Sequence, residues 1–434
     1  MMQALFTLCA VIYLLIYAFE GVIRYGLSSV GMDNLILLRD ALVTAPLALL
    51  FVAQALRMTL HPAFFVFAAI VALHGGIAAA NLHTTLPAIY GAKLLLNVLF
   101  GFIAAGSLTQ PSRRVLWLLG LLWLATVAGV ALDKFVYTFP WMGLRTHIGG
   151  VEVDVSRGWD IDSGFDKRAA GFTRSSISAA MVMPTLALVI APRIRNVIVR
   201  FLLIAATVAA VTLTTQKGAL IAIIVAGTIL CLSGRQCYAP LRAACIAAAV
   251  LDVAVPALTA GLLVPGDGGV FSFASFALRI SNTWPDAWRW IQNNEIFPFG
   301  VGLGGIGGAQ RFYAQNFFNP SDNLAIFLYA NFGIFGLGYL GWACLVSRGL
   351  PEHLHRLAVP ALAVLTFNFV YGVALSMLED QVSAMFIGVA TGALWQLREF
   401  KLGGRWSDPF GGSTARWYVS NISLARRETL ARTP

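Results

Sequence analysis

Charged residues are scarce in this 434-residue sequence: they make up only 12% of the chain, whereas 58% is hydrophobic. A soluble domain of this size carries about twice that charged fraction. Apolar runs of about twenty residues, the length that a bilayer requires of a helix, recur along the sequence. The scarcity of charge therefore excludes an ordinary soluble protein and predicts an integral membrane protein built of helices.

Cysteine is also sparse, and its spacing excludes two kinds of site. The five cysteines form no C-x-x-C pair, and most fall in or beside apolar runs. We therefore expect neither a disulfide framework nor a metal centre, and we predict no cofactor. The net charge of +10 comes from basic residues in short loops between apolar runs. That distribution is typical of membrane proteins, so nucleic acid is not an expected partner.

About twelve apolar segments are predicted to span a membrane, which makes the expected fold all-α and polytopic. Their approximate cores are residues 3–19, 35–56, 62–80, 86–108, 115–133, 172–192, 198–215, 218–234, 243–264, 322–346, 357–377 and 381–397. Lys93 and Asn97 interrupt the segment 86–108, which is therefore either a span or a re-entrant segment. We expect one transmembrane domain over residues 1–400 and a flexible polar tail over 401–434.

The charge of the loops predicts how the spans are oriented. Basic residues such as Arg113, Arg114 and Arg235 gather in short loops on one side. That side is expected to be cytoplasmic and to receive both termini. Two long loops, 134–171 and 265–321, fall on the other side and mix acids, bases and aromatic residues. Function is predicted to reside there.

The stretch 272–323 combines tryptophans, arginines and a glycine run between two apolar spans. It is predicted to form a lid or platform over a site at the membrane surface. Trp284 and Trp288 share one helical face, with Arg279 before that helix and Arg289 on it. A guanidinium grips phosphate oxygens in a fork. The arginines therefore either bind a phosphate or hold the helix at lipid headgroups.

Two further positions place charge at the same boundary. Lys217 lies in a turn with almost no loop, where the free amides of the following helix favour an anion. The alternative is a plain hairpin with a snorkelling lysine. Asp322 opens an apolar span, where it would act either as a proton acceptor or as a helix cap.

Three charges lie in or at the mouth of apolar segments. Arg39 and Asp40 are adjacent at the mouth of the second span, and Lys93 lies inside the segment 86–108. Charges at such depth are costly unless each finds a partner. The sequence therefore favours an ion pair between Arg39 and Asp40 over a direct substrate contact. For Lys93, a functional role and a snorkelling side chain are equally compatible with the pattern.

Four motifs, taken in order, resemble the bacterial O-antigen polymerase and ligase superfamily. FEGVIRYGL…LILLRD is similar to the N-terminal region of its exopolysaccharide polymerases, and TLTTQKGALIA resembles the TxSRGAxxA turn. ALRISNTWPDAWRWIQNNEIFPFGVGLGG resembles the "R…W…P.fG.G.G" loop, and SDNLAIFLYANFGIFGLG resembles the "HN.yl..l.e.GiiGl" span. Each motif is loose by itself, and the specificity lies in their order and spacing over most of the chain.

The resemblance implies a metal-independent glycosyltransferase of the bacterial inner membrane. Members of the superfamily move glycans from undecaprenyl pyrophosphate to an acceptor hydroxyl on the periplasmic face. On this chain it implies that Lys217 and Arg279 neutralise the leaving pyrophosphate. Asp322 stands where the family has a histidine and would activate the acceptor. The further candidate substrate-binding residues are Arg39, Lys93, Trp288, Arg289 and Asn323.

Lysine in place of arginine and aspartate in place of histidine favour a polymerase of exopolysaccharide repeat units. Ligation of a finished glycan to lipid A core is the alternative within the same chemistry, and a transporter or flippase is the alternative from another class. The expected partners are membrane lipid and a glycan donor and acceptor carried on undecaprenyl pyrophosphate. The sequence leaves open whether a co-polymerase that controls chain length also binds.

Overall fold

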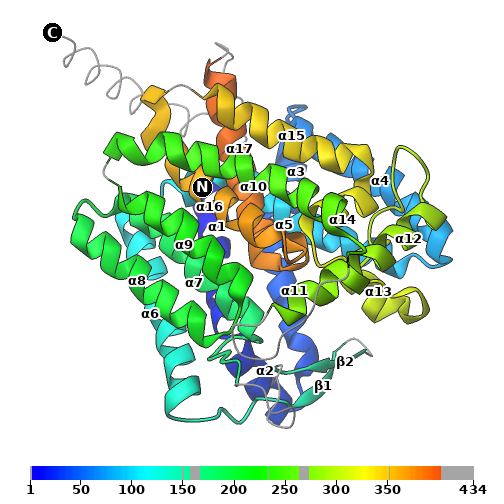
Figure 1. Ribbon diagram of the computed structural model, residues 1–434, viewed down its shortest axis with the longest axis horizontal. Coiled ribbons are helices and arrows are strands. Elements are labelled where there is room, and N and C mark those ends of the chain that lie inside the picture. Colours follow the sequence, from blue (N-terminus) through cyan, green and yellow to red (C-terminus); the bar gives the residue numbers. More distant parts are fainter. Residues whose placement is uncertain are drawn as a thin grey trace.

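The structure, a computed structural model, describes residues 2–148, 151–156, 167–232, 234–262, 273–350 and 352–401. Its regular structure in these ranges is helical, apart from one two-stranded sheet (Figure 1). Six helices are long and apolar enough to cross a membrane, or seven if the bent pair α1 and α2 counts as one span. The all-α, polytopic prediction is thus confirmed, whereas twelve spans are not established. The predicted tail beyond residue 401 and parts of both long loops lie outside the described residues.

Most of the bundle follows the predicted apolar segments. The six long helices are α3 (Leu38–Leu56, after the 3₁₀ turn Asp33–Leu37), α4 (Pro62–Leu82), α5 (Leu86–Thr109), α6 (Arg113–Phe135), α7 (Ser176–Ile190) and α10 (Tyr238–Thr259). The other helices that overlap predicted spans are α1 (Met2–Ala18), α8 (Val197–Leu213), α9 (Lys217–Cys231), α14 (Leu324–Phe332), α15 (Ile334–Gly349), α16 (His355–Gly372) and α17 (Gln381–Lys401). The segment 86–108 forms one continuous helix, α5, and not a re-entrant loop.

Glycines let the backbones of α5 and α17 approach closely in the middle of the bundle (Figure 1). A Cβ atom added at Gly388 would lie 2.1 Å from the Val98 carbonyl oxygen, and one at Gly101 would lie 1.9 Å from the Met385 oxygen. Such small residues are typical of helix interfaces in membranes, where backbone proximity maximises van der Waals contact. This packing fixes the start of α17, which supplies part of the site.

The predicted span 322–346 is broken into two helices, α14 and α15, at Gly333. This glycine has φ +59°, and a Cβ atom there would lie 1.9 Å from the carbonyl oxygen of Pro298. The amide that follows, of Ile334, donates a hydrogen bond to the same oxygen. A distant segment of the chain therefore interrupts the helix, and a count of apolar residues does not detect such a contact.

The outer stretch 272–323 is built into the protein and does not lie flat on it. From residue 274 it forms α11 (Ala274–Leu278), a π-helical turn (Arg279–Thr283), α12 (Trp284–Asn294) and α13 (Gly308–Tyr313). On the face of α12 that carries the tryptophans, Trp284 and Ile291 are fully buried, and α12 packs against α14. The tryptophans anchor this segment to the bundle.

A short antiparallel hairpin lies at the lower end of the view in Figure 1, near α2 (Glu20–Ser29). Its strands are β1 (Arg145–Ile148) and β2 (Val151–Asp154), with Arg145 opposite Asp154. The hairpin contacts the 3₁₀ turn that precedes α3. It falls within the long loop 134–171, for which the sequence pattern predicted no strand.

Candidate functional site

A polar groove of about 340 Å³ opens at one end of the bundle. The end of α1 and the starts of α2, α3, α5, α7 and α17 reach it. The outer segment from Gly307 to Asp322 and the turn between α16 and α17 complete its lining. Free amides and the helix dipole give each helix N-terminus a partial positive charge. The convergence of several N-termini thus makes this end of the bundle favourable for a negatively charged ligand.

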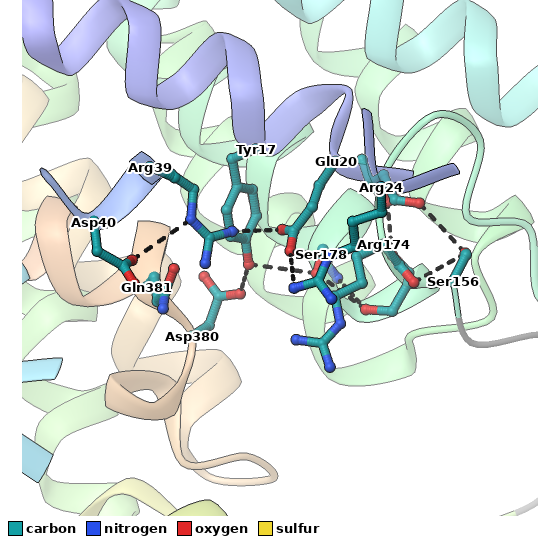
Figure 2. A network of polar contacts seen from close by, with 12 residues as sticks. Tyr17, Glu20, Arg24, Arg39, Asp40, Ser156, Arg174, Ser178, Asp380 and Gln381 are labelled. Carbon is teal, nitrogen blue, oxygen red and sulfur yellow. Dashed lines mark hydrogen bonds and ion pairs between the residues drawn. The ribbon is translucent and has the colours of Figure 1, made fainter. Parts of the chain in front are cut away.

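Glu20 is the centre of a buried charge cluster on one wall of the groove (Figure 2). Its side chain is 1% exposed, and its carboxylate lies 2.8 Å from Arg39 and 2.6 Å from Arg24. Arg174 is within electrostatic range on the side away from Arg39. The sequence predicted Asp40 as the partner of Arg39, but that contact is 3.8 Å long. The closer partner comes from α2, because the 75° bend after α1 turns Glu20 inward.

Replacing Glu20 by glutamine is expected to destabilise the protein by about 3–5 kcal/mol, because two buried guanidinium groups would lose their carboxylate. Thermal unfolding of the purified protein in detergent measures this effect. Glu352→Gln is the control: Glu352 pairs with Arg235, and both side chains are more than half exposed. An exposed pair of this kind contributes about 0–1 kcal/mol. Equal, small effects of both changes would contradict a structural role for the cluster.

Lys93 has a partner within the membrane domain. Its ammonium group lies 2.6 Å from the carboxylate of Asp40, and neither side chain is fully buried. The pair joins α5 to α3 beside the charge cluster and leaves Arg39 to bind Glu20. An ion pair therefore explains why a lysine is tolerated here. Arg39 lines the groove, whereas Lys93 is not among the lining residues and contacts Asp40 instead.

Glu379 faces the groove from the short turn between α16 and α17. Its carboxylate accepts hydrogen bonds from the Gly308 amide and the Ser376 hydroxyl. Burial raises the pKa of Glu379 above its usual value; the negative charge of Asp322 acts in the same direction, whereas the two hydrogen bonds and Arg311 oppose it. A carboxyl group with a raised pKa in a groove is a candidate for proton transfer.

The raised pKa of Glu379 predicts the sign of its effect on stability. The folded state holds the proton more tightly than the unfolded state, so the charged carboxylate destabilises the fold as the pH rises through the folded-state pKa. Glu379→Gln should therefore raise the midpoint of thermal unfolding at about pH 8 but much less at about pH 4, where the carboxyl group is mostly protonated in both states. A midpoint that is raised equally at both pH values would show that the carboxylate charge is not the cause.

Asp322 lies on the same groove and pairs with Arg279 from the π-helical turn, at 3.3 Å. The neighbouring residue Asn323, and not Asp322, caps α14: its side-chain oxygen accepts the Ile326 amide at 2.9 Å. The alternative interpretation of Asp322 as the cap is therefore wrong. Asn323 is fully buried, and its amide donates to backbone oxygens, one of them that of Asp252. Asn323 is not among the residues that line the groove.

Lys217 and Arg279 lie at the same end of the bundle, near Tyr371 of α16. The Tyr371 hydroxyl donates a hydrogen bond of 3.2 Å to Gln216, and a Cβ atom at Gly218 would lie 2.7 Å from the tyrosine ring. Arg279 is within electrostatic range of the same tyrosine. Tyr371 is thus a neighbour common to the turn that holds Lys217 and to the pair of Arg279 and Asp322.

Two other predicted substrate contacts point elsewhere. The side chain of Arg289 is 73% exposed and binds Asp286 on its own helix. Trp288 is half-buried and packs against the ring of Tyr329, with centroids 5.6 Å apart. Both side chains stabilise α12 and its contact with α14, and neither is among the residues that line the groove.

Sequence reasoning missed two arginines that line the groove, Arg174 and Arg311. Arg174 directly precedes Ser175, which caps α7 by accepting the Ser178 amide. Arg311 lies on the short helix α13. A serine cap before an apolar run was the one signal in the sequence that places Arg174 at a helix N-terminus. Within the described ranges, no three His, Cys, Asp or Glu residues gather in a way that would hold a metal ion.

Comparison with known proteins adds nothing to this geometry: no family model, curated protein or solved structure matches the chain. The fold and groove define a helical membrane protein with an ionisable site at one end.

Proposed function

We propose that the protein is a metal-independent glycosyltransferase that polymerises oligosaccharide repeat units carried on undecaprenyl pyrophosphate. One observation carries the proposal: a single groove at the end of a membrane bundle brings two carboxylates, Asp322 and Glu379, together with two arginines, Arg174 and Arg311. Transfer from a pyrophosphate needs both kinds of group. Carboxylates accept the proton of the acceptor, and cations stabilise the leaving group.

The distribution of basic residues supports placing the groove on the periplasmic face of a bacterial inner membrane. Arg193 donates to the Thr109 carbonyl at the end of α5 that lies away from the groove. On that side, Arg113 begins α6 and Arg235 lies in the 3₁₀ turn Gly234–Cys237 that precedes α10. Arginine-rich short loops mark the cytoplasmic side. The proposal therefore places both termini in the cytoplasm.

In the proposed reaction, an acceptor hydroxyl oxygen attacks the anomeric carbon of the donor sugar. The new carbon–oxygen bond forms as the bond from that carbon to the phosphate oxygen breaks, and the electron pair leaves with the pyrophosphate. Asp322 takes the proton of the hydroxyl. Arg174 and Arg311 stabilise the negative charge that develops on the leaving group, and Arg279 holds Asp322 in position. Lys217 adds positive charge at the rim.

Apolar side chains next to Arg39 support a path for the polyprenyl tail. Leu35, Leu37 and Leu38 precede Arg39 in the chain and are between 44% and 63% exposed. In a membrane, such side chains face lipid or a lipid-like ligand. A donor whose pyrophosphate lies in the groove can therefore extend its tail along the start of α3 without burying it in the bundle.

Analysis of the carrier-linked glycans in a deletion strain tests this proposal. A polymerase predicts that single repeat units accumulate on undecaprenyl pyrophosphate and that long polymer disappears. Ligation to lipid A core predicts instead that finished long glycans accumulate on the carrier. Normal polymer on the periplasmic face, with no accumulation of either species, would contradict both forms of transfer.

A further inference from the structure

A second hollow of about 500 Å³ opens directly next to the groove. The two share the side chains of Arg174, Arg311, Phe312 and Phe318. One wall of this outer hollow is the hairpin, and the other is α13 with the turn that follows it. Both volumes fall in the range of small-molecule sites, about 300–1,000 Å³. Together they form one path from the ionisable site towards the hairpin.

The outer hollow combines flat apolar rings with planar polar groups. Phe318 is 42% exposed, although it is a large apolar residue, and Phe312 lies beside it against the ring of Tyr90. Around these rings lie the polar side chains of Gln315 and of the hairpin residue Arg145. Sugar rings present an apolar face and hydroxyl edges. Aromatic rings contact the former and planar hydrogen-bonding groups the latter.

The hairpin carries two carboxylates against one arginine, which favours a carbohydrate over a polyanion. Arg145 lies 3.4 Å from Glu152 and 3.8 Å from Asp154 on the neighbouring strand. A nucleic acid or phosphate-rich ligand would require a surplus of positive charge along the whole surface. The hollow instead becomes more basic only towards Arg174 and Arg311, where it meets the groove.

The hairpin wall is fixed to the inner site. The hydroxyl of Ser156, just after β2, donates a hydrogen bond of 2.9 Å to the carbonyl oxygen of Arg174. Trp141, just before β1, donates from its indole to the Gly171 oxygen at 3.3 Å and stacks on Phe139. The outer wall is therefore held at a set distance from the reacting groups, and rigid support of this kind makes a binding site selective.

We propose that the outer hollow is a carbohydrate-binding subsite, which holds the sugar units next to the ring at which transfer occurs. Phe318 provides the stacking platform, and Gln315 and Arg145 bind hydroxyl groups. This inference deepens the proposed function and depends on it for the identity of the glycan.

The test measures binding of free oligosaccharides, without any lipid carrier, to the full-length protein in lipid nanodiscs. The probes are a panel of neutral and uronic-acid-containing oligosaccharides of bacterial origin, observed by saturation-transfer NMR and titration. We expect the wild-type protein to bind members of this panel and Phe318→Ala to weaken that binding about fivefold to tenfold. Phe318→Trp should retain it. Phe135→Ala, which removes an exposed ring at the end of α6 that does not line the hollow, should have no effect.

Failure of this inference can be told apart from failure of the proposed function. Asp322→Asn should abolish transfer yet bind the oligosaccharides as well as the wild type. If the oligosaccharides bind in a way that depends on Phe318 but the protein has no transferase activity, the subsite proposal stands and the polymerase proposal is rejected. No binding by any oligosaccharide, equal binding by Phe318→Ala, or a preference of the hollow for unglycosylated peptides would overturn the subsite, whatever the activity.

Discussion

Asp322→Asn is expected to lower the rate of glycan transfer about a hundredfold or more, the contribution of a positioned general base. Asparagine has the same shape but does not accept the proton of a sugar hydroxyl. The measurement is the release of undecaprenyl pyrophosphate from a carrier-linked oligosaccharide by the purified variant.

The substitution isolates the role of the carboxylate charge, because two structural explanations for a loss of activity do not apply. These are the loss of a helix cap and a strained backbone. Asn323 caps α14, so the cap is retained in the variant. Asp322 has φ +41°, a conformation that asparagine adopts as readily as aspartate. The variant loses the ion pair of 3.3 Å between Arg279 and Asp322, but the asparagine oxygen can still accept a hydrogen bond from Arg279. The unfolding midpoint should therefore fall only slightly, and abundance in the membrane should match the wild type. A fully active variant would exclude Asp322 as the base and leave Glu379 and Asp380, which line the same groove, as the carboxylates to test.

Arg174→Gln should lower the same rate about a hundredfold, because removal of one fixed donor at a developing negative charge has an effect of this size. Arg311→Gln should act in the same direction. Arg174→Lys should recover part of the activity, since it keeps the charge but not the forked geometry. Arg235→Gln is the matched control: Arg235 pairs with Glu352, away from the groove.

The pattern of these arginine effects is also informative. If the guanidinium groups stabilise the leaving pyrophosphate, the loss should appear in kcat more than in the apparent affinity for the donor. A change in KM alone would show that Arg174 binds donor and transition state equally. Wild-type rates for both Arg174→Gln and Arg311→Gln would remove the cations from the proposed site.

The sequence predicted the helical character well because apolar runs must satisfy their own backbone hydrogen bonds in lipid. The predictions from sequence were wrong where they depended on contacts between segments that are distant in the chain. The break at Gly333 depends on the Pro298 carbonyl oxygen, and the burial of Trp284 depends on α14. Hydropathy reports the length of an apolar run but contains nothing about such contacts.

The same limit applies to the site. The sequence placed Arg279 and Asp322 at one boundary, and the structure pairs them. It matched Arg39 with its neighbour Asp40, whereas the bend after α1 brings Glu20 closer. Arg311 was missed because a single arginine in a long loop carries no periodic signal. Arg174 was missed because it lies at the very start of the predicted span 172–192, two residues before α7 begins. Their shared groove appears only when the outer segment folds back against the start of α7.

Reconstitution in lipid nanodiscs with an oligosaccharide repeat unit on undecaprenyl pyrophosphate is the most direct test of the central claim. That claim is that the groove cleaves the glycosyl–pyrophosphate bond. We predict free undecaprenyl pyrophosphate in amounts equal to the new linkages, with glycans lengthened by whole repeat units. A donor that stays intact in the nanodiscs, or that crosses a sealed vesicle membrane uncleaved, would contradict the account.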